Sequence, residues 1–278
     1  MSILSPNPTG DLIWQTAWQS RIFRRKFFIG LVGIITLLLG FPYFFQTIEQ
    51  HTGPVLNDWV LNQLPPHDVS LWIFLIIWAS ALLLVIRARF SPAIFMLFVY
   101  GYIIVSLSRM LSINLVPLNP PVGLIPLIDP ISNAFYGKTY ITKDLFYSGH
   151  TSTILLIFLC LRRKWDRLLV LIGSVIVGGL LLVQHVHYTV DVLGAFVFTY
   201  PLYWVGKRLA LSGWNNVEHN FDLKAPVKLS DVSRKVFRKR TFLNSLYPKI
   251  HRSPENYFLS TNTTINCLRV SIKPESVF

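Results

Sequence analysis

Six apolar stretches, each close to the ~20 residues that a membrane-spanning helix needs, constrain this chain more than any other feature. They cover residues 27–45, 70–86, 93–112, 148–163, 168–186 and 189–207. The 278-residue chain is 52% hydrophobic and only 14% charged, and its mean hydropathy is +0.48. Such a composition is typical of polytopic membrane proteins. The sequence therefore predicts an all-α protein, a six-helix transmembrane bundle with a basic cytoplasmic C-terminal tail.

The same stretches divide the chain into three parts. We expect residues 1–26 to form a cytoplasmic N-terminal segment, 27–208 the six-helix membrane domain, and 209–278 a flexible or lightly folded tail. The tail holds 11 of the 26 Lys and Arg residues. On a membrane protein such an excess marks the cytoplasmic side and anionic headgroups, so we expect no nucleic-acid partner. Residues 1–20 lack the apolar core of a cleavable signal peptide, so the first helix is the expected targeting signal.

The charges between the stretches alternate and predict an orientation. The segment 46–69 has no Lys or Arg, and 113–147 has only Lys138 and Lys143. The opposite ends of the stretches carry Arg21, Arg24, Arg25, Lys26, Arg87, Arg89, Arg162, Arg163, Lys164, Arg167, Lys207 and Arg208. The positive-inside rule then puts both termini in the cytoplasm. We expect an integral protein of a bacterial inner membrane or an equivalent membrane, in contact with the bilayer.

Two polar strings stand at the extracytoplasmic edges of apolar stretches, SGHT at 148–151 and HYTVD at 187–191. Ionisable residues at such edges are costly, so a chain that keeps them is expected to use them. On a helix, His187 and Asp191 would share one face because they are four residues apart. A carboxylate beside an imidazole fixes its tautomer and raises its basicity, which suits a nucleophile or general base. His150 could act as a general acid from the opposite side.

The strings KDLFYSGHT (143–151) and HVHYTVDV (185–192) resemble the two signature motifs of sphingomyelin synthase-like proteins. Those proteins are a branch of the type 2 phosphatidic acid phosphatase superfamily of membrane lipid phosphatases and phosphotransferases. The resemblance covers roughly residues 60–205. It implies transfer of a phosphoryl or phospho-headgroup from a lipid phosphate or phospholipid substrate on the extracytoplasmic side, through a phosphohistidine and without a metal or other cofactor. The membrane domain would then be the catalytic domain.

The resemblance also implies a role for each residue of the two strings. His187 resembles the nucleophile, Asp191 its orienting carboxylate, and His150 the acid that protonates the leaving alcohol. Ser148 and the amide of Gly149 resemble donors to phosphate oxygens. The physical chemistry agrees, because phosphoryl transfer needs a nucleophile, an in-line acid and donors around the equatorial oxygens. A glycine at a helix start also lets the backbone approach an anion closely.

A first phosphate-binding motif is expected further upstream. The wider superfamily has a lysine and an arginine seven residues apart, followed by proline. Here Tyr102 and Arg109 have that spacing and Met110 follows. The synthase branch also has a tyrosine and an arginine in this region. We expect Arg109 to bind the phosphate, because an arginine near a helix end is costly unless it contacts an anion or snorkels to the interface.

The chain departs from the phosphatase pattern at one phosphate ligand. That branch has an arginine six residues before its second-motif histidine, where this chain has Leu181. Lys143 and His185 are the candidates to replace it. The synthase branch also lacks this arginine, but it has Cys-Gly-Asp where this chain reads TKD at 142–144. Asp144 could orient Lys143 or a headgroup amine, or be an ordinary loop carboxylate.

Two further classes of function compete with the enzyme. His150, His185, His187 and Asp191 could bind zinc, although His185 and His187 are two apart and would diverge on a helix. The other alternative is a non-catalytic lipid-binding membrane protein with a degenerate site, against which the intact histidines and carboxylate argue. The lipid substrate, the acceptor (water or a lipid alcohol) and the oligomeric state stay open.

Overall fold

The computed structural model of the protein describes residues 14–127 and 141–213, and every regular element within them is helical. The elements are α1 (Trp14–Gln19), α2 (Arg21–Glu49), the 3-10 turn η1 (Leu61–Gln63), α3 (Ser70–Ala88), α4 (Pro92–Leu115), α6 (Gly149–Cys160), α7 (Lys164–Val183) and α8 (Thr189–Leu211). The predicted all-α class is therefore confirmed for this part of the chain. The predicted tail beyond residue 213 and the first 13 residues lie outside the described residues.

Each predicted apolar stretch coincides with one helix, but the helices differ as candidate membrane spans. By length and hydropathy, α2, α3, α4 and α7 qualify as spans. Helix α6 has only 12 residues, because Ser148 caps its start and the helix ends before the charged pair at 162–163. Helix α8 is 23 residues long but less apolar. Four spans are thus supported by the structure, and the full count of six stays a prediction.

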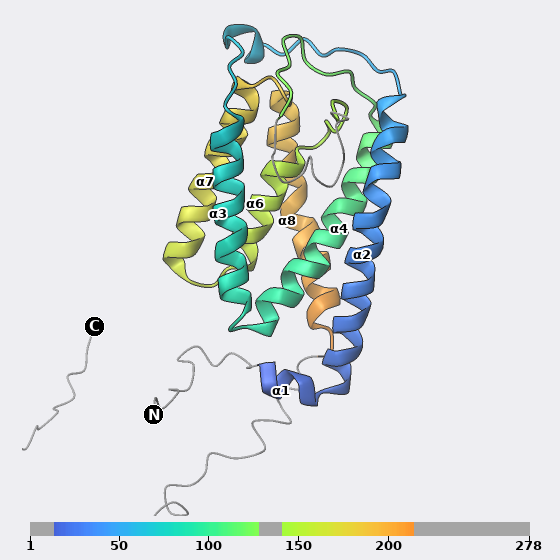
Figure 1. Cartoon of the computed structure of the whole chain (residues 1–278), viewed down its shortest axis with the longest axis vertical. Helices are drawn as coiled ribbons and strands as arrows, with labels where there is room; N and C mark the ends of the chain where they lie inside the picture. The colour runs from blue at the N-terminus through green and yellow to red at the C-terminus, as the bar shows by residue number, and fades with distance from the viewer. Residues whose placement is uncertain (1–13, 128–140, 214–278) are drawn as a thin grey trace, which may run out of the picture. The chain divides into compact units, whose positions relative to one another are not determined.

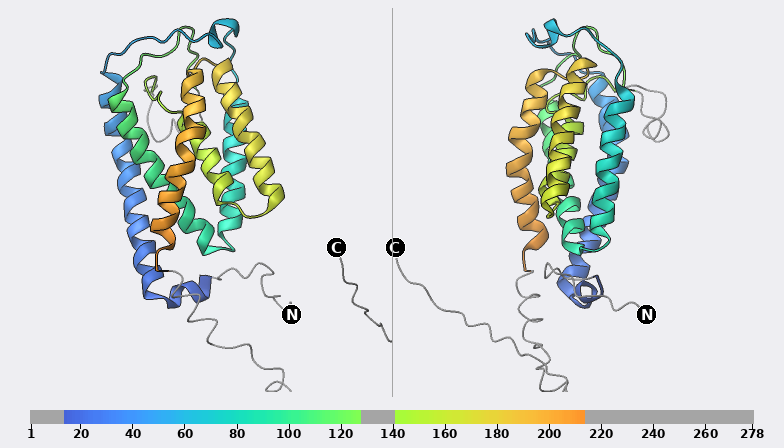
Figure 2. Two further views of the ribbon diagram at one scale, coloured as in Figure 1. Left: turned by 180° about the vertical axis from the view of Figure 1, so that it is seen from behind. Right: turned by 90° about the vertical axis from the view of Figure 1, so that its left-hand side faces the viewer.

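The described helices belong to one compact unit, residues 1–224, and pack side by side (Figure 1). Helix α4 packs against α2 and α8, and α6 contacts α3, α4, α7 and α8. The start of α2, the α3–α4 turn, the α6–α7 turn and the end of α8 all lie at one end, which we call the basic end (Figure 2). The segments 50–69, 116–127 and 184–188 lie at the opposite end, the loop end (Figure 1).

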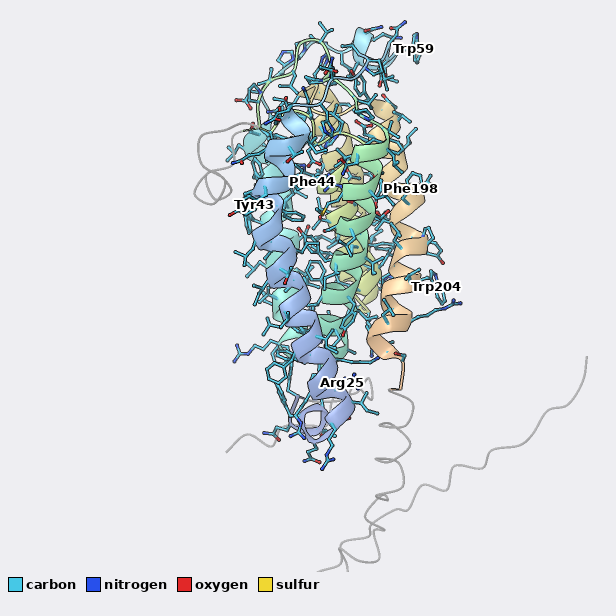
Figure 3. All side chains as sticks on the ribbon, turned by 90° about the vertical axis from the view of Figure 1, so that its right-hand side faces the viewer. Arg25, Tyr43, Phe44, Trp59, Phe198 and Trp204 are labelled. Carbon is cyan, nitrogen blue, oxygen red and sulfur yellow. The ribbon has the colours of Figure 1, made fainter. Side chains whose placement is uncertain are left out.

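The interior is apolar and the outer faces of the helices are apolar as well. Ile73, Met96 and Leu156 are fully or almost fully buried in the central core. Tyr43 on α2 and Trp204 on α8 point away from the bundle (Figure 3) and are 75% and 45% exposed. A helix that is apolar on all sides is typical of a membrane span, whose outer face meets lipid. The pattern supports an integral membrane protein.

Polar contacts fix the helix ends at the basic end. Arg87 on α3 and Asp166 on α7 form a two-pronged ion pair, with Nε–Oδ2 and Nη2–Oδ1 distances of 2.6 and 3.0 Å. The Lys26 ammonium donates to the carbonyls of Leu209 and Ala210 at the end of α8, at 2.7 and 3.2 Å. A cation at a helix C-terminus satisfies carbonyls that have no partner within the helix. The first contact joins α3 to α7, and the second joins α2 to α8.

Candidate active site

The first polar string folds as the start of α6. The buried Ser148 is its N-cap: its Oγ accepts a long hydrogen bond from the Thr151 amide (3.4 Å) and donates to Thr151 Oγ1 (3.2 Å). Both hydrogen bonds of the Ser148 hydroxyl are therefore made to Thr151 in the first turn of α6. The first amides of a helix have no carbonyl partner inside it and form a natural anion site. The structure thus puts Gly149 and His150 where the backbone attracts a phosphate.

The second string forms the turn into α8 and is tied to the first. Asp191 Oδ2 accepts the Tyr188 amide at 3.0 Å and so caps the first turn of α8. The backbone carbonyl of Asp191 accepts the Ser148 amide, also at 3.0 Å. The two strings, about forty residues apart in sequence, are therefore joined by a main-chain hydrogen bond.

His187 and Asp191 come together as predicted, but not on one helix. Helix α8 begins at Thr189, so His187 lies in the turn before it. The expectation of a shared helix face was wrong, and the turn brings the pair together instead. His187 Nδ1 is 3.5 Å from Asp191 Oδ2, and both side chains are at most 1% exposed. This distance exceeds an N–H···O hydrogen bond, but catalytic hydrogen bonds often tighten only when substrate binds.

The second histidine faces the first. The ring centres of His150 and His187 are 6.4 Å apart, with an angle of 65° between the ring planes. The His150 ring also lies edge-on to Phe74 of α3, at 6.2 Å between centres. Because Nδ1 of His187 faces Asp191, its Nε2 is the nitrogen left for chemistry. The two imidazoles are close enough to act on one group.

Arg109 of α4 lies directly against the start of α6. Its Nε donates to the Tyr147 carbonyl at 2.9 Å, and its Nη2 forms a short ion pair with Asp144. A Cβ atom added to Gly149 would lie only 2.5 Å from the guanidinium carbon Cζ. A residue with a side chain would therefore displace the guanidinium from its contacts with Tyr147 and Asp144. The structure pairs Asp144 with Arg109, a partner that was not among the roles expected from the sequence.

Lys143 and His185 both have backbone carbonyls as partners. The Lys143 ammonium donates to the carbonyl of Glu49 (2.8 Å) and to that of His51, at the end of α2. The ring nitrogens of His185 lie 2.8 and 3.0 Å from the carbonyl oxygens of Val122 and Leu64. Carbonyls only accept, so both contacts are hydrogen bonds only if both ring nitrogens carry protons. These contacts favour a structural role for both residues, and their predicted role in phosphate binding stays a prediction.

The position of the missing arginine and the remaining candidate, Tyr102, both pack against apolar side chains. Leu181, at the position of the phosphatase arginine, is 0% exposed in the central core. Tyr102 stacks on Phe98 with 5.7 Å between ring centres and packs near the apolar cluster on α2. It lies two helical turns before Arg109 on the same helix. Among the described residues, no group of three or more His, Cys, Asp or Glu is arranged to hold a metal ion.

One residue of this region, Asp58, was not predicted from the sequence. The carboxylate of Asp58 accepts the Thr189 amide at 2.6 Å and the Thr189 hydroxyl at 2.9 Å, and also the amides of Val60 and Leu61. Burial raises the pKa of Asp58, but these hydrogen bonds outweigh it and the net pKa is lowered. The only signal in the sequence is a carboxylate in a segment that has no Lys or Arg to pair with.

The comparison with protein families agrees with this geometry. Residues 143–208 match the family model described as PAP2 superfamily C-terminal. The matched segment contains both polar strings and runs from the loop before α6 almost to the end of α8. A search of curated proteins found no match. The match over residues 143–208, which carry His150, His187 and Asp191, supports membership in the PAP2 superfamily. Together with the apolar helices, it supports a membrane protein of the phosphatase and phosphotransferase type.

Proposed function

We propose that the protein is an integral-membrane lipid phosphatase or phospho-headgroup transferase that works through a phosphohistidine on the extracytoplasmic side. One observation carries the proposal: His150, the His187–Asp191 pair and Arg109 converge at the start of α6. They supply the nucleophile, acid and positive charge that phosphoryl transfer needs. The substrate class is a lipid phosphate or phospholipid, because the site belongs to a bundle with apolar outer faces.

In the first step, Nε2 of His187 attacks phosphorus while the bond from phosphorus to the leaving oxygen breaks. His150 gives its proton to that oxygen, and the alcohol departs. In the second step, water or a lipid alcohol attacks the phosphohistidine and the P–N bond breaks. His150 accepts the proton of the incoming nucleophile. Asp191 holds the proton on Nδ1 of His187 and stabilises the positive charge that develops on the ring.

Arg109 and the amides at the start of α6 would stabilise the equatorial phosphate oxygens. The described hydrogen bonds of the guanidinium engage Nε and Nη2, and Nη1 would lie 2.5 Å from a Cβ atom added to Gly149. Nη1 is thus the nitrogen suited to an anion bound at the helix start. Asp144 keeps the guanidinium in place between substrates and compensates its charge.

The charge pattern supports the sidedness. The basic residues of the sequence follow the helix ends at the basic end, while the α7–α8 turn with His187 lies at the loop end (Figure 2). The positive-inside rule then makes the loop end extracytoplasmic. In a bacterial inner membrane or its equivalent, both termini would be cytoplasmic.

The test is phosphate release from a short-chain phosphatidate by the purified full-length protein in detergent with EDTA present. We expect turnover with EDTA and none for His187→Ala. A parallel reaction with a lipid alcohol acceptor, followed by mass spectrometry of the products, separates phosphatase from transferase. Loss of wild-type turnover in EDTA, restored by zinc, would favour the metal site. Lipid binding without turnover of any phosphate ester would favour the non-catalytic alternative.

A further inference from the structure

The turn that carries His187 is held from outside by the loops at the loop end. The Tyr188 hydroxyl accepts the Leu56 amide at 3.1 Å and donates to the Asn119 carbonyl at 2.8 Å. Thr189, the next residue, donates its amide and its hydroxyl to Asp58. The nucleophile therefore precedes two residues that are both fixed by partners about 70 to 130 positions away in sequence.

Asp58 adds a second cap to the start of α8. Asp191, in the first turn, accepts the amide of Tyr188, the residue before the helix, whereas the amide of Thr189 has its partner in Asp58. Asp58 Oδ2 takes up the first amide of α8, and Oδ1 takes up the Thr189 hydroxyl. A carboxylate at a helix N-terminus also interacts favourably with the helix dipole. The same carboxylate caps η1 through the amides of Val60 and Leu61, so one side chain joins the loop to the helix.

We propose that Asp58 is a positioning residue: by fixing Thr189 it sets the geometry between His187 and Asp191. In the sequence, Thr189 is midway between His187 and Asp191. The closest polar atoms of these two residues are 3.5 Å apart. A small displacement of the first turn of α8 therefore changes this distance directly. The inference rests on the proposed function, because its effect is on phosphoryl transfer. Small misplacements of reacting groups typically cost much of the rate.

Asp68 provides a matched control. Its Oδ1 accepts the amide of Ser70 at 3.0 Å and the hydroxyl of Ser70 at 2.7 Å, at the start of α3. It thus makes the same kind of cap, on the same loop segment, at a helix that does not carry His187 or Asp191. If the role of Asp58 were merely structural, Asp58→Asn and Asp68→Asn would have the same effects on Tm and kcat.

The first experiment compares the kinetics of the full-length wild type, Asp58→Asn and Asp68→Asn on a short-chain phosphatidate in detergent. We expect both variants to lower Tm. We expect only Asp58→Asn to lower kcat, on the order of 10-fold, with KM within about twofold, because the loss falls on the reacting geometry rather than on binding. Equal kcat values for the two variants, or a change confined to KM, would overturn the inference.

The second experiment tests whether Asp58 acts through Thr189. Thr189→Ser keeps both donors and should match the wild type, whereas Thr189→Val loses the hydroxyl contact and should lower kcat a few-fold. In the double variant Asp58→Asn/Thr189→Val, the loss of kcat should be smaller than the product of the two single losses, because both substitutions weaken the same contact between Asp58 and Thr189. Fully multiplicative losses would overturn the link. Thr189→Val also serves as the test if Asp58→Asn does not fold. An inactive wild type would instead refute the proposed function, and the inference with it.

Discussion

At the scale of single residues, the His187–Asp191 pair is the most demanding feature of the molecule. Both side chains are buried, and within the described part of the chain neither His187 Nδ1 nor Asp191 Oδ1 has a hydrogen-bond partner. Buried polar atoms without partners are destabilising and are rare in folded proteins. Such a cost is reasonable where a bound phosphate group and a tightened His–Asp contact complete the site.

Replacement of His187 by alanine should reduce turnover by roughly 10³-fold or more, because the nucleophile is lost. Asp191→Asn should be slower than the wild type but more active than His187→Ala, since an amide still accepts from the Tyr188 amide while it no longer stabilises the imidazolium. The measurement is kcat on a short-chain lipid phosphate, with circular dichroism to verify folding. Residual activity of His187→Ala above a tenth of the wild type would refute its role.

Arg109→Lys should keep the charge but lose rate, on the order of 10-fold or more, because an ammonium cannot reproduce the planar fork of a guanidinium. Lys143→Ala is the companion variant. Its carbonyl partners at the end of α2 predict a lower Tm with KM within about twofold of the wild type. A silent Arg109→Lys together with an inactive Lys143→Ala would mean that the loop lysine holds the phosphate.

At the scale of the elements, the site depends on how closely α4 approaches the start of α6. The guanidinium of Arg109 fills the space over Gly149, so the shape of the first turn of α6 sets the position of the charge. The loop segments at the other side of the site bind the turn before α8 through Asp58 and the Tyr188 hydroxyl. The proposed anion site and the proposed nucleophile are thus each fixed by a contact between one helix start and a distant part of the chain.

Gly149→Ala should therefore displace Arg109, lower kcat strongly and destabilise the fold by roughly 1–3 kcal/mol, as overpacking typically does. Gly179→Ala on α7 is the control, since no heavy atom lies within 4 Å of a Cβ added there. It should be neutral or stabilising by up to about 1 kcal/mol, because alanine favours a helix over glycine. Kinetics and thermal unfolding of both variants provide the check, and a fully active Gly149→Ala would contradict the packing.

The cap of α8 predicts a pH dependence. Hydrogen bonds lower the pKa of Asp58 in the folded protein, so its contribution to stability is fully present above its unfolded pKa of about 3.9. That contribution is lost as the pH falls through the lower, folded pKa. The difference in Tm between the wild type and Asp58→Asn should therefore be constant above about pH 5 and shrink below about pH 4. A difference that grows on acidification would have the wrong sign for a depressed pKa.

At the scale of the whole molecule, the arrangement of charge and of apolar surface determines how the bundle sits in a bilayer. Long apolar helices qualify as spans, and the basic helix ends gather opposite to the site (Figure 2). An extracytoplasmic site would meet substrates from the outer leaflet. The orientation thus decides which pool of lipid the proposed enzyme uses.

Cysteine labelling should test this orientation in a Cys267→Ser background, since Cys160 is only 1% exposed. A cysteine in place of Val122, which is 80% exposed at the loop end, should react with a membrane-impermeant thiol reagent applied from outside. A cysteine in place of the exposed Lys164 at the basic end should react only after the membrane is permeabilised. The reverse pattern would invert the topology and the substrate leaflet.

The sequence by itself determined the positions of the helices, and it supplied the residues that are proposed to carry the chemistry. Long apolar stretches form helices because the bilayer leaves the backbone no other partners. The pairing of His187 with Asp191 also follows from local spacing, although a turn and not a helix face creates it. The local strings SGHT and HYTVD predicted the PAP2 superfamily, which the match over residues 143–208 supports, while the sphingomyelin synthase-like branch stays a prediction.

The tertiary structure decided the partners of the charged residues. Asp144 pairs with Arg109, Lys143 binds the end of α2, and Asp58 caps α8. These contacts join residues 35 to 131 positions apart, and no local periodicity encodes which carboxylate meets which donor. The segments 46–69 and 141–148 together contain more than one carboxylate and more than one donor. Only the packing of helices fixed in space decides which of them is within hydrogen-bond distance.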